Sequence, residues 1–66
     1  MNKVLKQGLH RDISGEKKAV RDYSQRIKES KDHPSASRTL RHIKGEEQEH
    51  KRELEGVLSG LKSAIK

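Results

Sequence analysis

A glutamate and a histidine three residues apart, Glu47 and His50, have the spacing of a metal-binding pair if they lie on a helix. Residues at this interval project from the same helix face, so a carboxylate and an imidazole can hold one ion together. Glu16 is the third candidate ligand, because it interrupts a row of apolar residues as Glu47 does. An unpaired carboxylate in such a row costs on the order of several kcal/mol unless a charge partner or a metal compensates. Neither row contains a lysine or arginine, which favours a metal.

These rows predict two amphipathic helices, because their members recur every three or four positions, the periodicity of one helix face. The first row consists of Leu9, Ile13, Glu16, Val20, Tyr23 and Ile27. The second row consists of Leu40, Ile43, Glu47, His50, Leu54, Val57 and Leu61. The pattern predicts a single domain over residues 1–66, with helices at about 3–31 and about 35–63 joined by a turn at about 32–34.

The turn determines how the two rows meet. Pro34 cannot continue a helix but suits the first turn of a new one, with Asp32 or His33 placed to cap it. A connection this short requires the helices to fold back antiparallel. Glu16 and Glu47 are about equally far from the turn, so we expect an all-α hairpin that brings both to the same level.

The composition indicates that the hairpin does not stand alone. Only 27% of the residues are hydrophobic and 39% are charged, and two helices cannot cover their own apolar face. We therefore expect a homodimer, or a higher even oligomer, that forms a four-helix bundle. Two-fold symmetry would collect four carboxylates and two imidazoles around two metal ions. Mixed carboxylate and imidazole donors favour a pair of iron or manganese ions over zinc.

The composition also excludes several classes of protein. The chain has no cysteine, which excludes disulfides, zinc fingers and cysteine-ligated clusters. Its longest apolar runs are two residues, so we expect no membrane span or secretory signal and a cytoplasmic location. The net charge is +6, but acids are interspersed with the bases and Tyr23 is the only aromatic residue. Nucleic acid is therefore not the expected main partner.

Two stretches, residues 16–23 and 40–50, resemble the ferritin-like superfamily. The likeness is to rubrerythrin-type domains and, in this short two-helix form, to encapsulated ferritins, and it covers about residues 9–62. It implies a di-iron carboxylate centre inside a four-helix bundle, completed here by dimerisation. The resemblance implies that Glu16 is a terminal carboxylate ligand, Glu47 a bridging one and His50 the nitrogen ligand. Tyr23 matches a position where relatives often place a tyrosine near the iron.

The resemblance implies a redox activity, either oxidation of Fe(II) by oxygen or peroxide, as in a ferroxidase, or peroxide reduction with an external electron donor. Rubrerythrins proper also carry a four-cysteine iron site, which this chain lacks. The alternative is a non-catalytic basic coiled-coil module that contacts nucleic acid or an acidic partner. In that module Glu16, Glu47 and His50 would only set the helix register. Metal dependence distinguishes the two interpretations.

Overall fold

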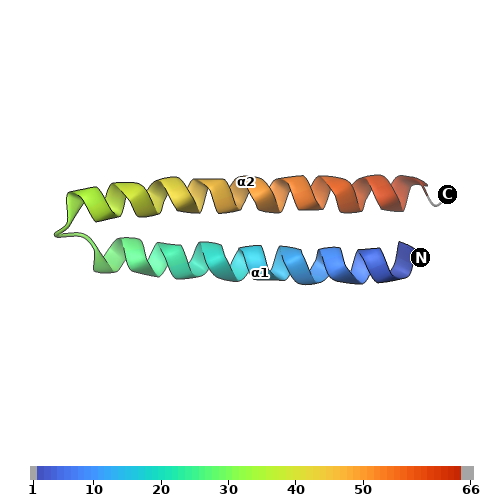
Figure 1. Ribbon diagram of the computed structural model, residues 1–66, viewed down its shortest axis with the longest axis horizontal. Helices are drawn as coiled ribbons and strands as arrows, with labels where there is room; N and C mark the ends of the chain where they lie inside the picture. Colours follow the sequence, from blue (N-terminus) through green and yellow to red (C-terminus); the bar gives the residue numbers. More distant parts are fainter. Residues whose placement is uncertain (1, 65–66) are drawn as a thin grey trace.

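The computed structural model describes residues 2–64 and shows two helices lying side by side (Figure 1). Helix α1 spans Asn2–Glu29 and helix α2 spans Pro34–Ala64. The chain reverses between them, so the start of α1 and the end of α2 lie at the same end of a rod of 52 × 14 × 12 Å. The predicted all-α hairpin is confirmed. Over the described residues, neither helix contains a stretch long and apolar enough to cross a membrane.

Helix α1 ends two residues earlier than the spacing predicts, because hydrogen bonds of Ser30 terminate the helix. The backbone N–H and the hydroxyl of Ser30 both donate to the carbonyl of Ile27, at 3.2 and 3.0 Å. These bonds satisfy a carbonyl that the helix end leaves without a helical partner. The carbonyl of His33 accepts the first backbone bond of α2, from Ser37 at 2.9 Å. His33 is therefore the residue that precedes α2, and Pro34 occupies its first position.

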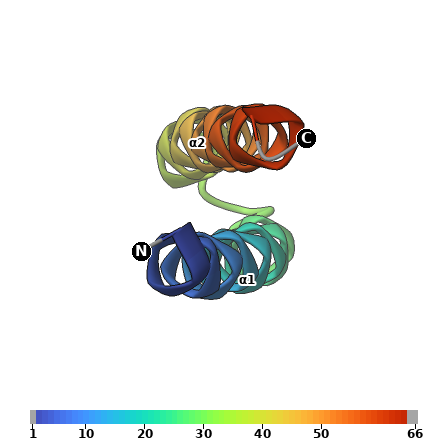
Figure 2. The ribbon, with the colours of Figure 1, turned by 90° about the vertical axis from the view of Figure 1, so that its right-hand side faces the viewer.

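The hydrophobic core is small and lies in the half of the hairpin away from the turn. It consists of Leu9, Ile13 and Leu58, with Leu54 and Leu61 packed against it. Each of the three buried residues keeps 7% of its surface exposed, and no described side chain is completely enclosed. Viewed along the rod, the two helices form a single pair with both lateral sides uncovered (Figure 2). Among the described residues, the large hydrophobic side chains of Val4, Leu5 and Val57 are exposed to solvent.

The buried face of α2 is rotated from the face that the spacing predicts. Leu58, which lies outside the predicted row, is buried against α1, whereas Val57 remains 52% exposed. The side chain of His50 is likewise 54% exposed. Consecutive helical residues are about 100° apart, so the rotation of α2 about its own axis decides whether Val57 or Leu58 faces α1. Within one hairpin, Val57 and His50 therefore border the contact between the helices and are not enclosed by it.

Candidate metal centre

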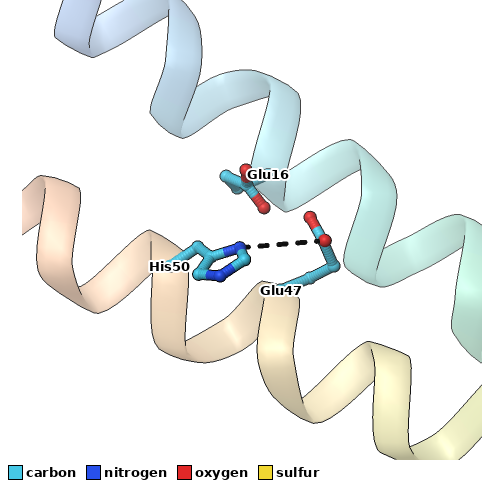
Figure 3. Close-up of side chains that lie close together, drawn as sticks. All are labelled: Glu16, Glu47 and His50. Carbon is cyan, nitrogen blue, oxygen red and sulfur yellow. Dashed lines mark ion pairs between the residues drawn. The ribbon is translucent and has the colours of Figure 1, made fainter.

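Three potential metal ligands from the two helices meet midway along the hairpin (Figure 3). Glu16 comes from α1, Glu47 and His50 come from consecutive turns of α2, and one donor atom of each lies within 4.8 Å of the others. The turn explains this register. Glu16 lies fourteen residues before Ser30, and Glu47 lies fourteen residues after His33. Equal arms of an antiparallel hairpin come to the same level, so the structure brings together all three predicted ligands.

The three side chains differ in their exposure to solvent. Glu16 is half-buried, and its Oε2 atom is enclosed with no hydrogen-bond partner among residues 2–64. The side chain of Glu47 is 23% exposed and that of His50 is 54% exposed. His50 Nδ1 lies 3.9 Å from Glu47 Oε1, the pair joined by the dashed line in Figure 3. That distance suits an ion pair with a protonated imidazole but is too long for a hydrogen bond.

The neighbouring groups raise the pKa of the Glu16 carboxyl above its ordinary value of 4.5. The main cause is Glu47, because a protonated Glu16 can donate a hydrogen bond to that carboxylate. Partial burial and the negative charges of Glu47 and Asp12 act in the same direction, whereas His50 acts against them. The metal-free cluster therefore holds two carboxylates that resist being ionised together.

The donor set fits a divalent cation. Ligand atoms bound about 2.1 Å from one ion lie no more than about 4.2 Å apart, so donors within 4.8 Å are close to that spacing. A cation would also give the enclosed Glu16 oxygen the partner it lacks among the described residues. Two carboxylates and one imidazole are donors that suit iron and manganese.

The imidazole end of the cluster opens into a groove along one side of the hairpin, here called the site groove. The residues that line it include Arg11, Asp12, Glu16, His50, Glu53, Leu54 and Val57. Glu53 is not among the ligands predicted from the sequence, although it follows His50 by three residues and so shares its helix face. The groove combines carboxylates with exposed apolar surface, and Arg11 offsets part of its negative charge.

Other residues considered from the sequence lie outside this cluster. Tyr23 is half-buried on α1, about 10 Å along the helix from Glu16, and its part in the chemistry stays a prediction. His42 lies on the exposed surface, where its Nε2 is 3.4 Å from Glu46 Oε1. Glu46, although adjacent to a proposed ligand, therefore points away from the cluster.

Comparison with known proteins identifies no relative. No protein-family model, curated protein or solved structure matches this chain. The likeness of residues 16–23 and 40–50 to the ferritin-like superfamily stays a prediction from the sequence. The function therefore has to be argued from the geometry of the cluster.

Proposed function

We propose that this chain is a di-iron carboxylate protein that shares its metal centre across a homodimer and oxidises Fe(II) with oxygen or peroxide. One observation carries the proposal: Glu16, Glu47 and His50 offer donor atoms within 4.8 Å of one another. One of these carboxylates has an enclosed oxygen with no partner among the described residues. A cation would supply that partner and remove the repulsion that raises the pKa of Glu16.

A second copy of the chain is the proposed occupant of the site groove. Val57 is 52% exposed there, and the groove opens directly at His50, so one hairpin leaves both apolar surface and the metal ligands uncovered. A two-fold interface is self-complementary and would bring a second set of three ligands to the first. The four carboxylates of two chains would balance the charge of two divalent cations. Dimerisation would thus complete the core and the metal centre together.

Each residue has a distinct role in this proposal. Glu16 and Glu47 would bind the cations and neutralise their charge, with Glu47 shared between them as the resemblance implies, and His50 would supply the nitrogen ligand. Fe(II) is the substrate: two ions each give up one electron, and dioxygen takes up both electrons with two protons to form hydrogen peroxide. Peroxide as the oxidant takes up two electrons and two protons to form two water molecules. Because cations compete with protons for Glu16, Fe(II) binding should weaken as the solution becomes acidic.

The test is to load the purified protein with Fe(II) without oxygen, remove unbound iron and count the iron that each chain retains. We expect about one ion per chain, that is two per dimer, and oxygen consumption when air is admitted. His50→Ala should lose the retained iron. His42→Ala is the matched control, because His42 is exposed and pairs with Glu46 away from the cluster.

Two results would refute the proposal. One is failure of the wild-type chain to retain iron, and the other is equal retention by the two histidine variants. Retention of Mn(II) without Fe(II) would refute the ferroxidase activity but keep the metal site. A chain that binds no metal would be better interpreted as a non-catalytic basic coiled coil.

A further inference from the structure

The fold gathers basic residues that are scattered along the sequence. Two grooves run along the hairpin between α1 and α2, and Gln48 lines both of them, so they adjoin. We call them together the basic groove, and its charged residues are Lys17, Arg21, Lys28, Arg41, Lys44 and Lys51. Over the described residues, no carboxylate lines either part. More than a third of the sixteen lysines and arginines of the chain thus line the basic groove.

The basic groove lies on the side of the hairpin opposite the site groove. Lys17 follows Glu16 and Lys51 follows His50 by one residue, a rotation of about 100° around each helix. Because the helices are antiparallel, these two rotations carry both bases to the same lateral side. A dimer formed through the site groove would therefore leave the basic groove accessible.

We propose that the basic groove binds the phosphate backbone of double-stranded nucleic acid without sequence preference. Lys17, Arg21 and Lys28 extend over about 16 Å of α1, and the bases of α2 face them across the groove. Duplex DNA presents one negative charge per about 1.7 Å of its axis with both strands counted, so this length of duplex carries about nine phosphates, of which about half belong to each strand. Gln48 adds an amide donor of the kind that contacts phosphate oxygens.

The basic groove lacks the aromatic and exposed apolar side chains that favour single-stranded nucleic acid or insertion into a membrane. The only aromatic residue of the chain, Tyr23, does not line it, so it offers no surface on which single-stranded bases could stack. The large hydrophobic side chains that the described structure exposes are Val4, Leu5 and Val57, and none of them lines the basic groove. Insertion below lipid headgroups would need such side chains, so a membrane surface could be held by charge alone.

The charge of the groove is available for binding. Among residues 2–64, the ion pair that involves it joins Lys51 Nζ to Glu55 Oε1 at 4.0 Å, and the two side chains are 30% and 46% exposed. An exposed pair of this kind contributes little and is readily exchanged for a phosphate. If all six bases contact phosphates, the logarithm of the affinity should fall with the logarithm of salt concentration with a slope of about −5.

The test compares two double variants of equal net charge. Arg21→Gln with Lys44→Gln removes two bases from the groove, whereas Lys18→Gln with Arg38→Gln removes two exposed bases outside it. None of the four forms an ion pair with another described residue. Binding is followed by the fluorescence anisotropy of a short labelled DNA duplex between about 50 and 200 mM salt. Vesicles of phosphatidylserine and phosphatidylcholine form a second arm, and thermal melting checks that each variant is folded.

We expect the groove variant to reduce the salt slope by about 2 and to weaken binding about 60-fold at about 0.1 M salt. The control variant should lose much less, because its bases affect the duplex only through net charge. Equal losses in the two variants would overturn the proposal, as would binding to vesicles without binding to the duplex. The proposal does not depend on the metal centre, so His50→Ala should bind the duplex as the wild-type chain does.

Discussion

Replacing Glu16 with glutamine separates the two contributions of this residue, its cost to the metal-free fold and its benefit to metal binding. Glutamine keeps the size of the side chain but carries no charge. Its amide can donate to Glu47, whereas an ionised Glu16 can only repel that carboxylate. We therefore expect Glu16→Gln to stabilise the metal-free protein at neutral pH and to abolish metal binding.

The increase in stability expected for Glu16→Gln follows from the geometry of the cluster. Two carboxylate charges within 4.8 Å of each other repel by at least about 1 kcal/mol, the value for that separation in bulk water. His50 lowers the pKa of Glu16 and so offsets part of this repulsion. For a domain of this size, about 1 kcal/mol raises the melting temperature by about 4–8 °C.

The raised pKa of Glu16 determines the direction in which the stability of the protein changes with pH. Because the pKa of Glu16 is raised, the folded chain keeps this proton at pH values where the unfolded chain has lost it. The stabilisation is complete below the ordinary value of 4.5 and is lost as the pH rises through the folded pKa. The wild-type protein should therefore lose stability over this interval, and Glu16→Gln should lack that loss.

Thermal melting followed by circular dichroism measures both effects, with a chelator present and at constant protein concentration. Glu49→Gln is the matched control, because Glu49 is exposed and lies outside the cluster. Added Fe(II), kept reduced, should raise the melting temperature of the wild-type chain and the control but not of Glu16→Gln. The reasoning is refuted if Glu16→Gln is less stable than wild type at neutral pH, or if it keeps the wild-type pH profile.

Two further substitutions test the core and the dimer interface. Leu58→Ala should lower the free energy of unfolding by about 2–4 kcal/mol in a urea titration, because Leu58 is one of the three buried core residues. A change below about 1 kcal/mol would show that α2 packs against α1 with a different rotation about its axis. Val57→Asp should change the stability of a single hairpin by no more than about 0.5 kcal/mol, since Val57 is 52% exposed. It should nevertheless shift the sedimenting species from dimer to monomer, and an unchanged dimer would exclude the site groove as the interface.

The sequence predicts the helices and the ligand cluster because both depend on local rules. Apolar residues every three or four positions define two helices, and Pro34 marks the start of the second. The Glu-x-x-His spacing places Glu47 and His50 on one face of a helix whatever that helix packs against. Glu16 joins them because a short turn forces equal antiparallel arms to the same level. Each step requires only distances along the chain.

The rotation of each helix about its own axis is not determined in this way. Leu58 and Val57 are both apolar neighbours in the sequence, and only the packing of α2 against α1 buries the first and exposes the second. The same packing produces the basic groove, because it aligns bases of α1 with bases of α2 that are 13 or more residues away in the chain. Local spacing determines the helices and the level of each residue along them. The fit of side chains between the helices determines which sides of the hairpin face solvent, and therefore which surfaces are available for a partner.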